Sequence, residues 1–162
     1  HCSGFGIGAS SFWGASPGVL LYDTAMAADP ETHPVTLGAC APLLIVSDLD
    51  ASVDHYVQRL GFACRARADG DGIFAMVGRD AAQILLKVIG PEVPPRPNPM
   101  RHPWAPWDVF VYVEDPDGYA RELAGRGCAV HTPLSNRDDG LRGFAVADPD
   151  GYVAFFGRPL AA

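Results

Sequence analysis

The sequence lacks the paired cysteines that mark common zinc and redox sites. Its four cysteines, at positions 2, 40, 64 and 128, lie far apart, and none belongs to a Cys-x-x-Cys pair. The Cys-x-x-Cys pair is typical of zinc-binding and thioredoxin-like motifs, so neither kind of site is indicated. Free thiols are usual for proteins in a reducing cytosol, so we expect a cytoplasmic protein.

Long apolar runs and basic clusters are absent as well. No stretch reaches the roughly 18 apolar residues that a membrane-spanning helix needs. The 12 Lys and Arg are outnumbered by 19 Asp and Glu, for a formal charge of −7. Nucleic acids and anionic membranes bind Lys/Arg patches, so neither is an expected partner. The acidic balance mildly favours a cationic ligand, although solubility is the simpler interpretation.

Residues 1–39 differ in character from the remainder of the chain. Gly, Ser and Ala dominate residues 1–25, and no Lys or Arg precedes Arg59, whereas a secretory signal peptide has a basic start. Met26 is a plausible native start. We expect residues 1–39 to be an N-terminal extension, poorly ordered or non-native before Met26.

Residues 40–90 predict a βαβββ unit. An apolar strand at 43–46 precedes Asp48, which can cap a helix that starts at Leu49, and Gly61 can end that helix. The later apolar stretches are separated by turn residues and predict three strands, at residues 62–67, 73–77 and 83–89.

A proline-rich stretch separates this unit from a second one. Residues 91–107 carry seven prolines, and proline has no N–H to donate inside a sheet, so we expect a linker loop. Residues 108–159 then repeat the first pattern, with Asp115 and Pro116 at the start of a helix. The expected strands lie at residues 109–113, 128–132, 141–147 and 152–156.

The two units correspond at nearly constant spacing. Val46 and Val113 precede the two helix caps at an offset of 67 residues, and Val77 and Val146 precede two turns at an offset of 69. The second of these turns, Asp-Pro-Asp-Gly, is a strong turn sequence. Such spacing indicates an internal duplication.

Two motifs resemble a known superfamily. The run from Val46 to Tyr56, followed by Leu60-Gly61-Phe62, resembles the opening module of the vicinal oxygen chelate superfamily of glyoxalases, bleomycin resistance proteins and extradiol dioxygenases. The run from Phe144 to Tyr152 resembles its closing strand pair. The resemblance covers about residues 40–159 and implies an α+β fold of two tandem βαβββ modules that form a cupped mixed sheet.

Catalytic members of this superfamily hold a divalent metal in the cup. The resemblance implies four ligand positions, which in this chain fall on Ala41, Leu86, Asp108 and Phe155. Three of them carry no donor group, and Asp108 alone cannot hold a metal ion. We therefore expect no metal, no other cofactor and no catalytic residue, although enzymatic activity stays open.

Eight residues are candidates for contact with a ligand. Trp104 and Trp107 flank Pro106 and offer flat faces for stacking, and Asp108 can meet a ligand ammonium group. The other candidates are the strand residues Phe110, Tyr112, Phe144, Phe155 and Leu86. For each strand aromatic, plain core packing is the simpler interpretation. The arginines can contact an anionic ligand, but solvation at strand edges explains them more simply: Arg65, Arg67, Arg137 and Arg142.

The leading hypothesis is a protein that binds a drug or metabolite without metal and acts by sequestration, as metal-free bleomycin-resistance-like members do. The resemblance also implies a homodimer whose ligand grooves are lined by both subunits. A cationic aromatic molecule is one option for the ligand, and antibiotic resistance one consequence. Two alternatives remain: a metal-dependent lyase, isomerase or dioxygenase whose ligands are misplaced here, and a non-catalytic dimerisation or regulatory module.

Overall fold

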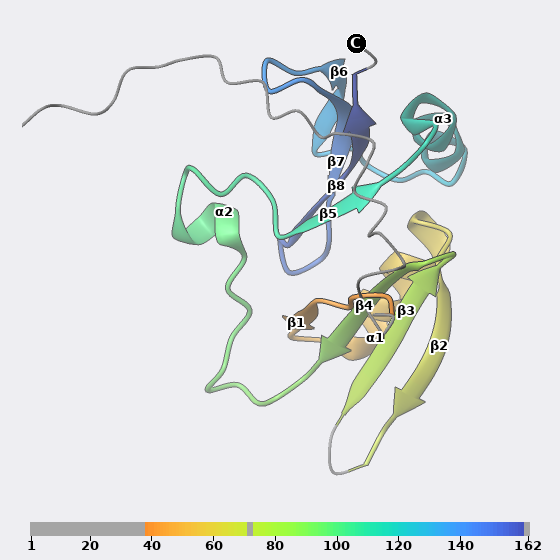
Figure 1. Ribbon diagram of the computed structural model, residues 1–162. Coiled ribbons are helices and arrows are strands. Elements are labelled where there is room, and N and C mark those ends of the chain that lie inside the picture. The colour runs from red at the N-terminus through yellow and green to blue at the C-terminus, as the bar shows by residue number, and fades with distance from the viewer. Residues whose placement is uncertain (1–37, 71–72, 161–162) are drawn as a thin grey trace, which may run out of the picture.

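The computed structural model describes residues 38–70 and 73–160 and shows two βαβββ modules (Figure 1). The predicted α+β class and the internal repeat are confirmed. Almost all of the predicted extension, residues 1–39, lies outside the described residues. The first module contains β1 (Leu43–Ile45), α1 (Leu49–Asp54), η1 (His55–Arg59), β2 (Ala63–Ala68), β3 (Phe74–Arg79) and β4 (Ala82–Lys87). The second contains β5 (Val109–Tyr112), α3 (Pro116–Gly125), β6 (Thr132–Asn136), β7 (Leu141–Ala147) and β8 (Val153–Pro159), and a short helix, α2 (Asn98–Arg101), lies between the modules.

Each module forms its own four-stranded mixed sheet. The strand orders are β1-β4-β3-β2 and β5-β8-β7-β6. In both sheets the first strand runs parallel to the last, and the two hairpins are antiparallel. A parallel pair requires a long crossover, which in each module includes the helix.

The two helix starts follow from their capping residues. The side chain of Asp48 accepts a hydrogen bond from the Ala51 N–H at 3.0 Å, and that of Asp115 accepts one from the Gly118 N–H at 2.8 Å. Both satisfy amides that have no partner within the helix. The first helix passes into the π-helical segment η1 and stops at Gly61, whose φ of +71° suits glycine best.

The helices cover one face of each sheet, and a shared core joins the modules. This core combines residues of α1, η1, α3 and the sheet faces beneath them. Tyr56, Leu86, Leu123, Phe144 and Phe156 are its largest members with almost no exposed surface. Because both modules contribute to one apolar cluster, burial of this surface ties them together.

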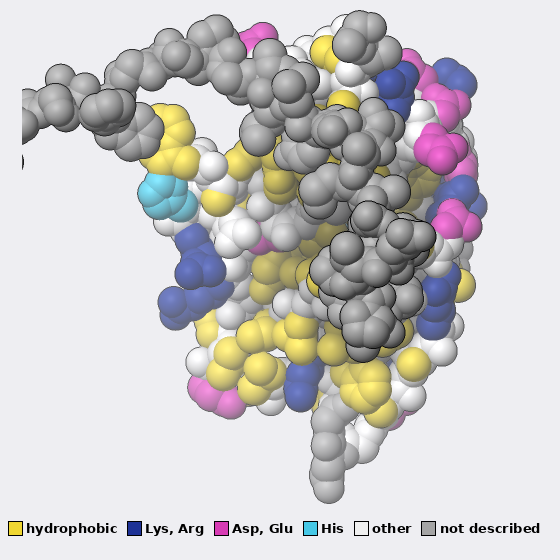
Figure 2. All heavy atoms as spheres, in the orientation of Figure 1, with side chains coloured by type: hydrophobic (Ala, Val, Ile, Leu, Met, Phe, Trp, Pro, Cys, Tyr) yellow, Lys and Arg dark blue, Asp and Glu magenta, His cyan; other side chains and the backbone are white. Residues whose placement is uncertain are grey.

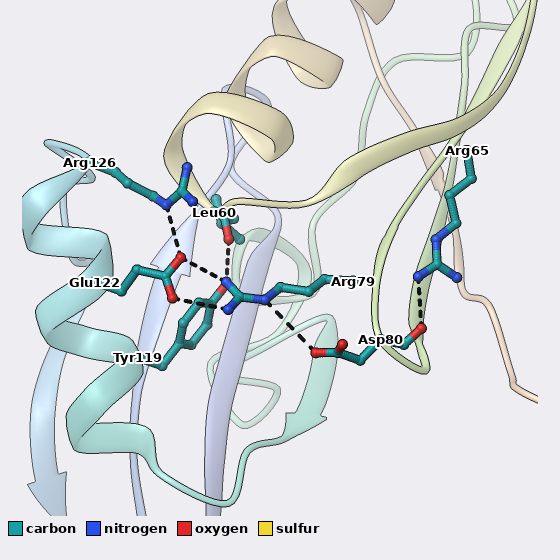
Figure 3. Close-up of polar contacts among 7 residues, drawn as sticks. All are labelled: Leu60, Arg65, Arg79, Asp80, Tyr119, Glu122 and Arg126. Atoms are coloured by element: carbon teal, nitrogen blue, oxygen red, sulfur yellow. Dashed lines mark hydrogen bonds and ion pairs between the residues drawn. The ribbon is translucent and has the colours of Figure 1, made fainter.

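Polar contacts add to this connection between the modules. The Tyr119 hydroxyl on α3 donates to the Leu60 carbonyl at 2.8 Å. Figure 3 shows Arg79, at the end of β3, reaching across to Glu122 on α3. Two of its nitrogens lie 2.8 and 3.0 Å from the carboxylate oxygens, and its guanidinium lies 5.2 Å from the ring centre of Tyr119.

The proline-rich loop leaves the first module, runs out beyond the sheets and returns to β5 (Figure 1). Its one helical turn, α2, contains Pro99 among its first residues and has no buried residue. Within residues 38–70 and 73–160, the structure shows no helix of the length and apolar character required to span a membrane.

Candidate functional site

Four aromatic residues gather on the face of the second sheet that α3 does not cover. Trp107 precedes β5, Phe110 and Tyr112 lie two residues apart on β5, and Phe155 lies on β8 opposite Phe110. Residues two apart on a strand share a face, which places these side chains together. We call Trp107, Phe110, Tyr112 and Phe155 the aromatic platform.

The rings of the aromatic platform are in mutual contact. The ring centres of Trp107 and Phe155 lie 4.7 Å apart at 32°, and those of Phe110 and Phe155 lie 5.2 Å apart at 39°. The ring of Tyr112 follows 4.7 Å from that of Phe110. Tilted contacts at these distances are favourable for aromatic rings. Phe155 is buried beneath its neighbours, whereas Tyr112 is 63% exposed at the rim.

Two glycines let the Phe155 ring lie flat against the sheet. A β-carbon added at Gly143 on β7 would lie 2.5 Å from the Phe155 ring and even closer to the Phe156 carbonyl oxygen, and one at Gly157 on β8 would lie 2.6 Å from the ring and from the Arg142 carbonyl oxygen. Side-chain atoms essentially never approach so closely, so any larger residue would displace the ring. The position of the platform therefore depends on the absence of side chains beneath it.

A cation lies over the platform. The Arg137 guanidinium, in the turn between β6 and β7, is 4.9 Å from the ring centre of Trp107 and 5.5 Å from that of Phe155. Its Nη2 forms an ion pair with Asp139 at 2.9 Å. The attraction of a guanidinium to an aromatic face holds this side chain at the platform.

Asp108 is held in place by the backbone of its surroundings. One carboxylate oxygen accepts from the Asn98 N–H at 2.6 Å, and the other accepts from the Val153 N–H at 2.8 Å. These bonds fasten the end of the proline-rich loop to the start of β8. The expected role of Asp108 as a partner for a ligand ammonium group gains no support from this geometry.

Two of the predicted site residues, Leu86 and Phe144, lie on the faces of their sheets that the helices cover, away from the aromatic platform. Leu86 and Phe144 are fully buried in the shared core beneath the helices. For Leu86 the cause is a one-residue difference between the hairpins: the offset of 69 between Val77 and Val146 becomes 70 between their partners Ile84 and Ala154. The true counterpart of Phe155 is therefore Leu85, because a slip of one residue exchanges the two faces of a strand.

Trp104 stands apart from the other candidates. It is 84% exposed in the proline-rich loop, and its backbone N–H donates to the His102 Nδ1 at 3.2 Å. The structure thus brings together four of the eight predicted residues, namely Trp107, Phe110, Tyr112 and Phe155. Arg137 is the residue at this site that was expected to be solvated at a strand edge. The one sequence signal for it is its position next to an Asp-Asp-Gly turn.

The donor set at the family's metal positions does not fit a metal ion. Ala41 and Phe155 offer no ligand atom, and neither Leu86 nor its corrected counterpart Leu85 offers one. Asp108 already accepts two backbone hydrogen bonds. Among the described residues, no group of three or more His, Cys, Asp or Glu side chains is placed to bind a metal.

Two cavities lie where the modules meet. One of about 490 Å³ lies between β1 and the proline-rich loop and is lined in part by Leu43, Arg96, Arg101, Asp108 and Tyr152. The other, of about 570 Å³, lies between the β3–β4 turn and the β5–α3 segment. Tyr112, a member of the aromatic platform, also lines this second cavity.

The outer face of the first sheet is mainly apolar, although Gln83 and Lys87 also lie on it. Leu43 is 50% exposed, and Ile45, Met76 and Leu85 are half-buried on the face opposite the shared core. Figure 2 shows hydrophobic side chains gathered over the lower part of the visible surface, where this module and the start of the proline-rich loop lie. An exposed, mainly apolar surface is typical of a binding surface.

The chain belongs to the glyoxalase/bleomycin resistance protein/dioxygenase superfamily, whose family profile matches residues 36–155. No curated protein sequence matches the chain. Among solved structures it is similar to TnmS3, an antibiotic binding protein from Streptomyces sp. CB03234, with 24% identity, 78% of this chain and 98% of the other covered, and a TM-score of 0.59.

Two further solved structures show the same fold. TioX from Micromonospora sp. ML1 is 24% identical, with 76% of this chain and 100% of the other covered and a TM-score of 0.57. A bleomycin-binding protein in complex with bleomycin is 18% identical, with 75% and 98% covered and a TM-score of 0.59.

Proposed function

We propose that this protein binds a flat aromatic small molecule on the aromatic platform and acts by sequestration, with no bond made or broken. The observation that carries the proposal is the platform itself, four aromatic side chains in contact on the sheet face opposite α3. Aromatic side chains supply large, rigid faces for stacking. One neighbour in fold is described as an antibiotic binding protein and another as a bleomycin-binding protein, which supports a small-molecule ligand of that general kind.

The ligand site we propose is completed by a second copy of the chain. The apolar outer face of the first sheet and the platform on the second sheet both face away from the shared core. The helices α1 and α3 pack on the other faces of the two sheets, in the shared core. We propose that the two faces meet across a homodimer, with the ligand between them.

We further propose that binding requires no metal. The residues at the family's ligand positions are Ala41, Leu85, Asp108 and Phe155, and only Asp108 has a donor, which is engaged by the backbone. Stacking and apolar burial then supply the affinity, as in small-molecule sites that are mainly apolar with a few placed polar groups.

One observation favours a second candidate function. Phe155 is 1% exposed because Trp107 and Arg137 lie over it, so this part of the platform is already packed. A packed face also suits direct contact between two copies without a ligand. The alternative is therefore a dimerisation module, and a ligand screen distinguishes it from the binder.

The test is a thermal-shift screen of planar aromatic antibiotics against chelator-treated protein, with metal analysis before treatment. We expect at least one compound to raise the melting temperature in saturable fashion, with equal effect in the presence of EDTA. Stoichiometric tightly bound metal that is required for binding would overturn the metal-free proposal. A dimer that responds to no compound would favour the dimerisation module.

A further inference from the structure

We propose that Arg137 makes the aromatic platform selective for planar molecules that carry an acidic group, such as an aromatic carboxylate or phenolate. This inference rests on the proposed function, because it names the class of ligand that the same site takes. It reverses the sequence expectation of a cationic ligand.

Asp139 orients the side chain of Arg137. Its Nε lies 2.9 Å from one oxygen of Asp139 and 3.2 Å from the other, and its Nη2 also contacts Asp139 at 2.9 Å. The carboxylate thus occupies the side of the guanidinium formed by Nε and Nη2. A guanidinium has a second edge, formed by Nη1 and Nη2, that can bind a carboxylate with two parallel hydrogen bonds.

That second edge has no partner within residues 38–70 and 73–160. Nη1 of Arg137 makes no hydrogen bond there, and the side chain is 30% exposed. The plane of the guanidinium is meanwhile held over Trp107 and Phe155. A ligand ring on the exposed part of the platform, next to Phe110 and Tyr112, would therefore present an acidic substituent to a pre-oriented donor pair.

The charge of the surroundings matters as well. Asp139 is paired with Arg137, and both oxygens of Asp108 accept backbone hydrogen bonds. The other arginines considered from sequence are engaged away from the platform: Arg65 with the Asp80 carbonyl, Arg67 with Asp50 and Asp69, and Arg142 with Asp117. Of these four arginines, Arg137 is the one that lies at the platform.

A ligand with an ammonium group would bind weakly at this position. It would approach a fixed positive charge, and Asp139 could receive it only by giving up its hydrogen bonds to Arg137. An acidic group would instead accept hydrogen bonds from the free edge of Arg137, and the contact between Arg137 and Asp139 would stay in place. Hydrogen bonds between charged groups are stronger than neutral ones, so the charge of the ligand decides its affinity.

The test uses three probes that share one ring system and differ in charge: 2-naphthoate, 2-naphthamide and 2-naphthylmethylammonium. Binding is followed by NMR through the indole N–H resonance of Trp107, assigned with a Trp107→Phe variant. For the wild-type protein we expect naphthoate to bind about ten- to a hundredfold more tightly than the ammonium compound, with the amide between them.

Two variants with equal loss of charge separate the local contact from net charge. Arg137→Gln removes the guanidinium at the platform, and we expect it to reduce the difference among the probes to less than about threefold. Arg121→Gln removes an exposed arginine of α3 and is expected to leave the difference unchanged. If Arg137→Gln does not fold, Arg137→Lys serves in its place and should keep the order of the probes with a smaller difference, because an ammonium cannot form the two-pronged contact.

The outcomes separate this inference from the proposed function. Equal affinities for the three probes, with clear shifts at Trp107, would refute charge selection and leave the aromatic site intact. Tightest binding of the ammonium compound would refute it as well and would restore the cationic ligand. No shift at Trp107 with any probe would contradict both proposals.

Discussion

At the scale of single residues, the position of Phe155 depends on two glycines that have no conformational role of their own. Neither Gly143 nor Gly157 has a positive φ, so both backbones suit other residues. What they supply is space: the Phe155 ring occupies the volume where their side chains would lie. The position of Phe155 in the aromatic platform therefore depends on residues of both β7 and β8.

Gly143→Ala should destabilise the fold and disturb the platform. The added β-carbon would clash with the Phe156 carbonyl oxygen and would lie 2.5 Å from the Phe155 ring and 2.9 Å from Gly157 Cα, and overpacking of this kind costs about 1–3 kcal/mol. Urea unfolding measures the loss. Gly125→Ala, where nothing lies within 4 Å of the new atom, should be neutral or stabilising; an equal loss at both sites would contradict the role of Gly143.

Asp148 is a buried acid between the modules. It accepts hydrogen bonds from the amides of Asp150 and Tyr152 and from the Tyr56 hydroxyl. Burial raises the pKa of Asp148 from 3.8 to about 6, and the backbone hydrogen bonds partly offset this rise. The folded protein therefore holds this proton more tightly than the unfolded chain does.

The sign of the resulting pH dependence follows from linkage. Between about pH 4 and pH 6 the native state binds more protons at Asp148 than the unfolded state, so stability falls as pH rises through this range. A rise in pKa from 3.8 to about 6 corresponds to roughly 3 kcal/mol. Asp148→Asn should remove most of this decline, as measured by urea unfolding at pH 4.5 and pH 7. Asp54→Asn, at an exposed helix position, should leave the decline in place, and an unchanged slope in Asp148→Asn would refute the assignment.

At the scale of elements, the sequence predicts helix starts well because each depends on a short local motif. Asp48 and Asp115 both cap as expected. The turn before β8 also forms as expected, with the Gly151 N–H bonded to the Asp148 carbonyl at 3.0 Å. Local hydrogen bonds of this kind are determined by a few neighbouring residues, so pattern is sufficient to find them.

The strands of the second module are harder to predict. A strand was expected at 128–132, but Cys128 is buried directly after α3, with its N–H bonded to the Leu123 carbonyl, and β6 begins at Thr132. The wrong assignment of Leu86, in place of Leu85, as the counterpart of Phe155 has a similar origin. Both depend on how far a hairpin or helix end extends, which is decided by tertiary packing across the sheet.

The contact between β3 and α3 gives a prediction for the junction of the modules. Replacing Glu122 with Gln should remove its ion pairs with Arg79 and Arg126 and lower the free energy of unfolding by about 0.5–1 kcal/mol, a modest value because these side chains are more than a third exposed. Urea unfolding of Glu122→Gln, Arg79→Gln and the double variant forms a mutant cycle. Additive losses would show that the two side chains are not coupled.

At the scale of the whole molecule, the fold and the superfamily follow from the sequence because two modules repeat the same order of motifs. The site follows only in part. The sequence identifies aromatic residues on β5 and β8, but the face to which they point depends on the strand register. Arg137 is far from them in sequence, since it follows Tyr112 on β5 and precedes Phe155 on β8 by many residues, and it reaches the platform from the β6–β7 turn. The cytoplasmic location stays a prediction.

The outer face of the first sheet predicts a dimer in solution. Leu43, on the edge strand β1, is 50% exposed beside the half-buried Ile45 and Leu85, and burial of such a surface favours association. Sedimentation at micromolar concentration should show a dimer for the wild-type protein and a folded monomer for Leu43→Glu. A wild-type monomer would remove the partner subunit from the proposed site.

The most direct measurement compares two tryptophans that lie three residues apart. Trp107 belongs to the aromatic platform, whereas Trp104 is 84% exposed in the loop before it. Calorimetric titration of a ligand identified by the screen should show a loss in affinity of about tenfold or more for Trp107→Leu and little change for Trp104→Leu. Equal affinity of the wild-type protein and Trp107→Leu would contradict binding at the aromatic platform.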